Sequence, residues 1–213
     1  MNKLKVWGLL LLGAVILSAC QKPVKIACVG DSITEGVGTQ VWNKSSYPVI
    51  LDSLMGPDYV VMNCGRSAAT MLKNSDMPYW KCNELDDVFI YQPDVIVIKL
   101  GTNDSKDHNW NAAAYEQDYQ ALIDTFQSIP THPKIYMCLP APAFEKRWNI
   151  NDTTIREQVI PIIERLASVN SLPVIDVYTG LQGQAGHFPD GIHPDEAGAK
   201  KLAEVIAEGL QVQ

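Results

Sequence analysis

The sequence predicts an α/β protein, a three-layer α/β/α sandwich built on a five-stranded parallel sheet. Two observations lead to this fold class. Five short apolar runs have the length and the continuous hydrophobicity of strands buried on both faces. Longer stretches with helical spacing of apolar residues separate those runs. Because parallel strands must be joined by crossovers, strand–helix alternation predicts right-handed connections with helices on both faces of the sheet.

The expected elements follow one another along the chain with little between them. The predicted strands are VKIACVG (24–30), YVVMNCG (59–65), DVIVIKLG (94–101), KIYMCLP (134–140) and LPVIDVY (172–178). Helices are expected over 46–56, 111–129, 152–170 and 194–210, with a shorter one over 83–91. Pro93, Pro133 and Pro173 precede strands, as residues that stop helices. With no repeat and no linker in sight, we expect one domain over residues 20–213.

Residues 1–19 have the pattern of a signal peptide. Lys3 and Lys5 form a positive start, and an apolar run follows that is too short for a stable membrane span. The run ends in Leu-Ser-Ala-Cys, which resembles the lipobox of bacterial lipoproteins. This predicts that Cys20 is lipidated and that the protein is exported and anchored at the bacterial cell envelope. The alternative is an ordinary signal peptide cleaved near Ala19.

Composition narrows the possible partners of the mature chain. Its length would be 213 − 19 = 194 residues, and loss of the two lysines would move the formal charge from −7 to −7 − 2 = −9. This acidity opposes binding to a phosphate backbone, so nucleic acid is not an expected partner. Membrane contact is expected only through the lipid anchor, and a monomer is favoured.

Four cysteines remain besides Cys20, and they are too widely spaced for a metal-binding motif. Cys28, Cys64 and Cys138 lie in strand-like apolar runs, where a buried free thiol is the expected state. An exported protein permits disulfides, and a Cys64–Cys82 bridge is the pairing that stays open.

The polar residues with chemical potential stand directly after the predicted strands. "GDS" follows the first strand, "NCGRS" the second, "GTND" the third and "PAPAF" the fourth, while "HFPDGIHP" precedes the last helix. Ligands of parallel sheets bind at the carboxyl ends of the strands. We therefore expect these segments to meet at one functional edge.

Ser32 in "VGDSITEG" is a candidate nucleophile, although the Gly-x-Ser-x-Gly elbow is absent. A serine hydroxyl needs a base, and a carboxylate can orient a histidine for that task. His193 is the histidine with a carboxylate at close fixed spacing, Asp190 in "DGIHP". The alternatives are that Ser32 only caps a helix, that Asp190 caps a turn and that His193 is a surface residue.

A serine nucleophile also needs hydrogen-bond donors for the oxyanion that develops on the attacked carbonyl. Gly65 after the second strand can offer a backbone N–H, and Asn103 after the third can offer a side-chain amide. Each has a structural alternative, a tight turn for Gly65 and a cap or turn for Asn103.

Taken together, "GDSITEG", "NCGRSAAT", "KLGTND" and "DGIHP" resemble the four sequence blocks of the SGNH (GDSL) hydrolase family, in the family's order. The resemblance implies a flavodoxin-like sheet with strand order 2-1-3-4-5. It implies Ser32 as nucleophile, His193 as general base and Asp190 as its orienting carboxylate. It also implies an oxyanion hole from the backbone N–H groups of Ser32 and Gly65 and the amide of Asn103. No metal or other cofactor is implied.

The substrate expected from the sequence is a small ester, most simply an O-acetyl group on a carbohydrate. An exported chain does not meet intracellular acyl-CoA, and no long apolar insertion is present to hold a fatty chain. Aromatic residues in the expected loops fit a sugar platform, or else anchor the loops in the core. They are Trp42, Tyr79, Trp80, Trp110, Phe144 and Trp148. The alternatives are a lysophospholipase or medium-chain esterase of the same family, and a non-catalytic glycan-binding lipoprotein.

Overall fold

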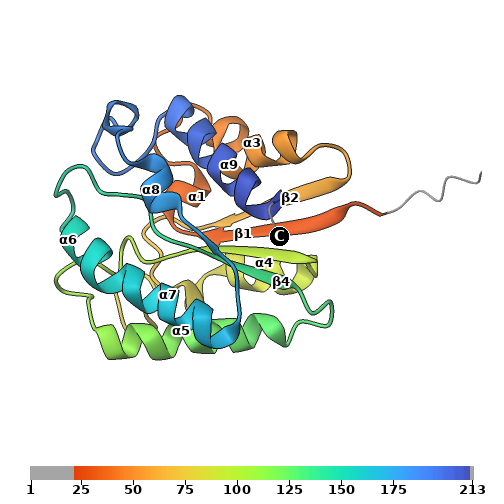
Figure 1. Ribbon diagram of the computed structural model, residues 1–213, viewed down its shortest axis with the longest axis horizontal. Helices are drawn as coiled ribbons and strands as arrows, with labels where there is room; N and C mark the ends of the chain where they lie inside the picture. Colours follow the sequence, from red (N-terminus) through yellow and green to blue (C-terminus); the bar gives the residue numbers. More distant parts are fainter. Residues whose placement is uncertain (1–21, 212–213) are drawn as a thin grey trace, which may run out of the picture.

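A computed structural model describes residues 22–211, which form a parallel sheet with helices on both faces (Figure 1). The predicted signal peptide and Cys20 lie outside the described residues. The strand order is β2-β1-β3-β4-β5, all pairs being parallel, so the predicted fold class and strand order are confirmed. The strands are β1 (Val24–Gly30), β2 (Tyr59–Gly65), β3 (Val95–Lys99), β4 (Lys134–Cys138) and β5 (Val174–Ile175).

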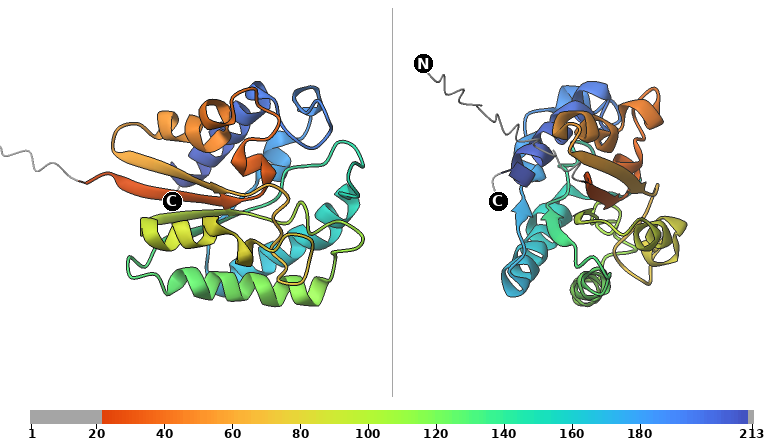
Figure 2. Two further views of the ribbon diagram at one scale, coloured as in Figure 1. Left: turned by 180° about the vertical axis from the view of Figure 1, so that it is seen from behind. Right: turned by 90° about the vertical axis from the view of Figure 1, so that its right-hand side faces the viewer.

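Five longer helices form the two outer layers, which Figure 2 shows from the side. They are α3 (Tyr47–Met55), α4 (Asn83–Tyr91), α5 (Ala112–Gln127), α7 (Ile160–Asn170) and α9 (Glu196–Gln211). Helices α3 and α9 pack together on one face, while α4, α5 and α7 cover the other. The short helices are α1 (Ser32–Glu35), α2 (Trp42–Ser45), α6 (Asp152–Thr154) and α8 (Val177–Leu181).

The expected strand at 172–178 is the main local error of the sequence prediction. Only Val174–Ile175 pairs with β4, and α8 begins directly afterwards. The reason is Asp176, whose carboxylate accepts a hydrogen bond from the Thr179 N–H at 2.8 Å and so caps the helix. The last helix likewise starts at Glu196, two residues after Pro194, because Asp195 caps it through the Gly198 N–H.

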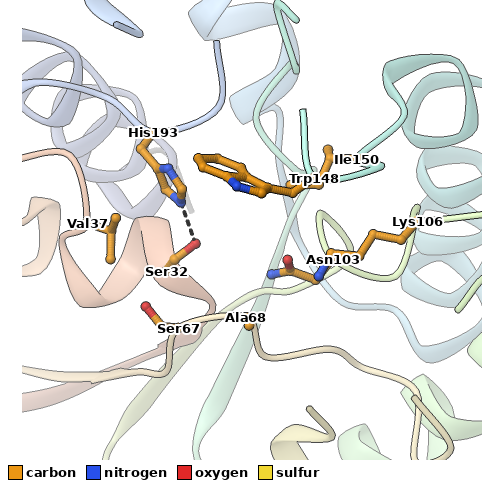
Figure 3. A pocket seen from close by; sticks show the side chains of 9 residues that line it. All are labelled: Ser32, Val37, Ser67, Ala68, Asn103, Lys106, Trp148, Ile150 and His193. Carbon is orange, nitrogen blue, oxygen red and sulfur yellow. Dashed lines mark hydrogen bonds between the residues drawn. The ribbon is translucent and has the colours of Figure 1, made fainter. Parts of the chain in front are cut away.

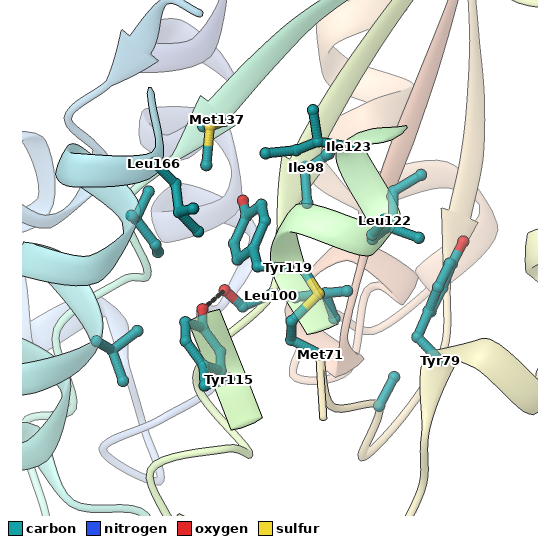
Figure 4. Close-up of a cluster of buried hydrophobic side chains, with 14 of the residues drawn as sticks. Met71, Tyr79, Ile98, Leu100, Tyr115, Tyr119, Leu122, Ile123, Met137 and Leu166 are labelled. Atoms are coloured by element: carbon teal, nitrogen blue, oxygen red, sulfur yellow. Dashed lines mark hydrogen bonds between the residues drawn. The ribbon is translucent and has the colours of Figure 1, made fainter. Parts of the chain in front are cut away.

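The buried side chains fall into two clusters, one under each helical layer. The larger cluster lies between the sheet and α4, α5 and α7, and Figure 4 shows its centre. There the hydroxyl of the buried Tyr115 donates to the Leu100 carbonyl at 3.2 Å, which satisfies its polar atom and ties α5 to the end of β3. Within residues 22–211, no helix is both long and apolar enough to span a bilayer.

The four described cysteines are all free, so the Cys64–Cys82 bridge is absent. Cys28, Cys64 and Cys138 are buried, as expected for thiols in apolar strands. Burial raises the pKa of Cys64 and of Cys138 to about 12, because the thiolate loses its hydration there. These thiols are therefore packing residues with little nucleophilic character.

Candidate active site

Ser32 is the first residue of α1 and follows the carboxyl end of β1 by two positions. The residue that caps α1 is its neighbour Asp31, whose carboxylate accepts the Ile33 N–H at 3.0 Å. The alternative role of Ser32 as a helix cap is therefore wrong. Its hydroxyl instead faces His193, with Oγ 2.9 Å from Nε2 (Figure 3).

Asp190 and His193 lie on the turn before α9 and are joined twice. The His193 backbone N–H donates to one carboxylate oxygen of Asp190 at 2.7 Å, and the His193 Nδ1 lies 2.8 Å from the other. A carboxylate accepts, so the Nδ1 carries the proton and the Nε2 lone pair faces the Ser32 hydroxyl. Burial by itself would raise the pKa of Asp190, but hydrogen bonds from His193 and Ile192 bring it below its ordinary value.

Asn103 follows β3 and lies in the same pocket as Ser32. Its side chain is almost fully buried, and its Nδ2 donates to the Ala69 carbonyl at 3.2 Å. The backbone carbonyl of Asn103 accepts from the side-chain amide of Asn109 at 3.1 Å, which holds the loop after β3. The contact with Ala69 orients the Asn103 amide, and no second acceptor for its N–H groups occurs within residues 22–211.

Gly65 is not part of this pocket, in contrast to the sequence prediction. Its N–H donates to the Asn63 side chain at 2.9 Å and is therefore already used. A Cβ at Gly65 would lie 2.2 Å from the Glu35 backbone nitrogen, so glycine is required here for the close approach of β2 to α1. Its role is to let the helix that carries Ser32 pack against the sheet.

Two residues of this loop line the pocket, Ser67 and Ala68, and the backbone of Ala68 is unusual. Ala68 has a left-handed backbone (φ 63°), which is uncommon for a residue with a Cβ. No acceptor for its N–H occurs within residues 22–211. Strained backbone of this kind concentrates at functional sites, and here it presents an unused N–H beside Ser32 and Asn103. No sequence pattern pointed to Ala68, since alanine rarely adopts this conformation.

A buried ion pair and a buried carboxyl group lie beneath the pocket, and neither was assigned a role from the sequence. Asp31 and Lys99 are 1% and 0% exposed, and their Oδ1 and Nζ are 3.1 Å apart. The other oxygen of Asp31 has no partner among the described residues. The pair joins the start of α1 to the end of β3, which are the elements that carry Ser32 and Asn103.

Asp104 is the second buried group and connects the β3 loop with the β2 loop. Its carboxylate accepts the N–H groups of Met71 and Leu72 at 3.0 and 2.9 Å. Burial raises the pKa of Asp104 to about 7, although these two hydrogen bonds act in the opposite direction. The carboxyl thus fixes the segment that follows Ala68.

The pocket has a volume of about 300 Å³ and is open to solvent on one side. It is lined by Ser32, Val37, Ser67, Ala68, Asn103, Lys106, Trp148, Ile150 and His193 (Figure 3). Within residues 22–211, no group of three or more histidine, cysteine or acidic side chains is arranged to hold a metal ion. The arrangement can transfer a proton from Ser32 to His193 and can offer N–H donors to an adjacent anion.

A serine, a histidine and an aspartate hydrogen-bonded in series at the carboxyl edge of a parallel sheet define the class of α/β serine hydrolases. Sequence comparison specifies the class further. The chain belongs to the GDSL-like lipase/acylhydrolase family, which its residues 28–201 match. The family resemblance noted in the sequence is thereby confirmed.

Individual relatives span a range of similarity. An acetylxylan esterase of Xylanibacter ruminicola is 39% identical over 88% of this chain, which covers 43% of that protein. The chain thus spans less than half the length of this relative. A rhamnogalacturonan acetylesterase of Bacillus subtilis is 22% identical, with 90% and 91% of the two chains covered. The structure of an aryl esterase of M. smegmatis superposes with a TM-score of 0.75 at 22% identity, over 89% of this chain and 99% of the other, which supports the fold.

Proposed function

We propose that this protein is a serine esterase that removes O-acetyl groups from carbohydrates through an acyl-enzyme. The observation that carries the proposal is the continuous series of hydrogen bonds from Ser32 through His193 to Asp190, at 2.9 and 2.8 Å, on the wall of an open pocket. A nucleophile with a correctly oriented base has no function in simple binding, so a non-catalytic glycan-binding protein is disfavoured.

In the first half of the reaction, the Ser32 oxygen attacks the acetyl carbonyl carbon while His193 Nε2 takes the hydroxyl proton. The carbonyl oxygen becomes an oxyanion, and we assign its donors as the backbone N–H groups of Ser32 and Ala68 and the Asn103 amide. Ala68 replaces Gly65 in this set because Ala68 lines the pocket and its N–H has no acceptor among the described residues, whereas the Asn63 side chain occupies the N–H of Gly65. Asp190 stabilises the imidazolium. The intermediate then releases the sugar alkoxide oxygen, which takes the proton from His193.

In the second half, a water molecule attacks the acetyl group on Ser32, and His193 takes one water proton. Collapse of the new tetrahedral intermediate breaks the bond to the Ser32 oxygen, which regains its proton from His193. The products are acetic acid and the free enzyme, so atoms and charges balance without a cofactor.

Two further observations support the proposal that the substrate is an acetyl ester of a carbohydrate. Two relatives carry names of carbohydrate acetylesterases, one for xylan and one for rhamnogalacturonan. The pocket of about 300 Å³ lies at the small end of the range for ligand sites, which suits an acetyl group better than a long acyl chain. A lysophospholipase or medium-chain esterase remains the second candidate within the family.

The test compares the wild type with Ser32→Ala on acetylated xylo-oligosaccharides, measuring released acetate. We expect a loss of at least ~10³-fold in kcat with an unchanged circular dichroism spectrum. Ser53→Ala is the matched control, because Ser53 is an exposed serine in α3 that does not line the pocket. Substantial turnover by the Ser32 variant would refute the nucleophile assignment. Activity that rises from acetyl to octanoyl esters would favour the lysophospholipase.

We further propose that the protein is exported, lipidated on Cys20 and active as a monomer. All proposed catalytic groups come from one chain, which supports the monomer. The chain enters the sheet at Val24, and Ser32 follows the other end of β1, roughly 20 Å away at ~3.3 Å per residue. An anchor just before Val24 would keep the pocket away from the membrane and open to a polymer. Radiolabelled palmitate should therefore label the wild type and spare Cys20→Ala.

A further inference from the structure

One aromatic side chain at the pocket differs from four other aromatic loop residues whose side chains the structure describes. Tyr79 is fully buried, and Phe144 packs on Phe188 at 4.9 Å between ring centroids. The indole N–H groups of Trp80 and Trp110 donate to Met71 and Gln158. These four therefore anchor loops.

Trp148 is 52% exposed and lines the pocket, and no acceptor for its indole N–H occurs within residues 22–211. Its ring centroid is 5.3 Å from that of His193, with an angle of 54° between the planes. In Figure 3 the indole lies beside His193, on the side of the pocket away from Val37. An apolar ring of this size next to a catalytic base, with its polar atom unused, is suited to a ligand with both apolar and hydroxyl groups.

The backbone around Trp148 is strained, which argues that its position is functional. Trp148 and Asn149 are both left-handed, with φ values of 52° and 61°. Such residues cost of order 1–3 kcal/mol each and persist only where the surroundings impose them. The guanidinium of Arg147 lies 4.7 Å from the centroid of the indole and supports it. Exposure of so large an apolar side chain on a strained loop therefore points to a role in binding.

Both ends of this loop are tied to the other loops of the site. The Phe144 N–H donates to the Gly191 carbonyl at 2.8 Å, next to Asp190. At the other end, the Asn151 N–H donates to the Ser105 hydroxyl at 3.1 Å, two residues beyond Asn103. The loop therefore holds the indole at a fixed place relative to the proposed catalytic groups.

We propose that Trp148 is a specificity residue that binds the sugar ring carrying the scissile acetyl group. The inference rests on the proposed function. His193 must protonate the departing sugar oxygen, so the sugar has to lie beside His193, where the indole is. The C–H bonds on one face of a pyranose are attracted to the negative face of the indole. The indole N–H is then available to a sugar hydroxyl. Trp148 should thus recognise the alcohol part of the ester and leave the acyl part unaffected.

The test measures kcat/KM of Trp148→Ala on two substrates, an acetylated xylo-oligosaccharide and ethyl acetate, whose alcohol is too short to reach the indole. We expect a loss of about 3- to 10-fold on the oligosaccharide, as for one aromatic stacking contact, mainly through KM. Turnover of ethyl acetate should stay within about twofold. Trp148→Phe, which keeps an aromatic face, should recover most of the oligosaccharide activity. Lys146→Ala is the loop control, because Lys146 is exposed on the same loop and does not line the pocket.

Unchanged oligosaccharide kinetics in Trp148→Ala would overturn the inference. An equal loss on both substrates would also overturn it, because the indole would then act by positioning His193. A wild type that hydrolyses ethyl acetate but no acetylated sugar would likewise contradict sugar recognition. If the wild type releases acetate from neither substrate, the proposed esterase function itself has failed.

Discussion

The buried carboxyl of Asp104 should make the stability of this protein fall as the pH rises toward neutrality. Asp104 is fully buried, and burial raises its pKa from 3.8 to about 7. Between these values the folded state holds the proton more tightly than the unfolded chain does. The free energy of unfolding therefore decreases with rising pH across this window and levels off above pH 7. A separation of about 3 pH units at ~1.36 kcal/mol each amounts to about 4 kcal/mol.

The assay is urea unfolding followed by circular dichroism at pH 5 and pH 8, for the wild type and Asp104→Asn. The amide does not titrate, so the difference between the two proteins isolates the Asp104 contribution from that of other carboxyls. About 2–3 kcal/mol of the effect falls between pH 5 and pH 8, and the wild type should lose that much relative to the variant. The variant should also be less stable at both pH values. The N–H groups of Met71 and Leu72 bind different carboxylate oxygens, and the amide nitrogen that replaces one of them cannot accept. Parallel changes in the two proteins would refute the reasoning.

Three further substitutions test other parts of the site. Lys99→Met should lower the free energy of unfolding in urea by ~3–5 kcal/mol, because it leaves the Asp31 carboxylate buried without a cation. A decrease below about 1 kcal/mol would contradict a contribution from the ion pair. Gly65→Ala should lower the melting temperature through overpacking of ~1–3 kcal/mol against the Glu35 backbone, and unaltered melting would show that the contact relaxes freely. Asp190→Asn should reduce kcat on acetyl esters by up to ~10⁴-fold with little change in circular dichroism, because the amide favours the wrong tautomer of His193. Near-normal turnover would remove Asp190 from the mechanism.

The fold was largely predictable from sequence because its signals are local. Four of the five strands are apolar runs bounded by glycine or proline, and the structure confirms them with small changes at their ends. The fifth strand was predicted too long, because the apolar pattern of 172–178 is common to a strand and to a buried helix. The capping residue Asp176 decided between the two, and its effect depends on a hydrogen bond to Thr179.

The site residues were predictable from the sequence where their chemistry depends on the type of side chain. Ser32 follows the end of β1 by two positions, and the turn before α9 brings Asp190 and His193 to the same edge of the sheet. The proposed oxyanion donor in the loop after β2 was not predictable, because every residue except proline has a backbone N–H. Gly65 drew attention as the glycine of the loop, yet the Asn63 side chain occupies its N–H. We propose Ala68 as the donor instead, and its left-handed backbone angle is a feature of the folded loop.

The polar groups beneath the pocket have a common effect on the three strand-end loops. The Asp31–Lys99 pair joins the β1 and β3 ends, while Asp104 and Asn103 both bond the backbone of the β2 loop. Burial of such groups stabilises little, since desolvation offsets most of their attraction. What they supply is rigidity, because a loop held by buried hydrogen bonds cannot shift without leaving a polar group unpaired. Oxyanion donors are effective when they are already oriented before charge develops. The buried ionic groups thus belong with the proposed catalytic machinery, although none of them touches the pocket.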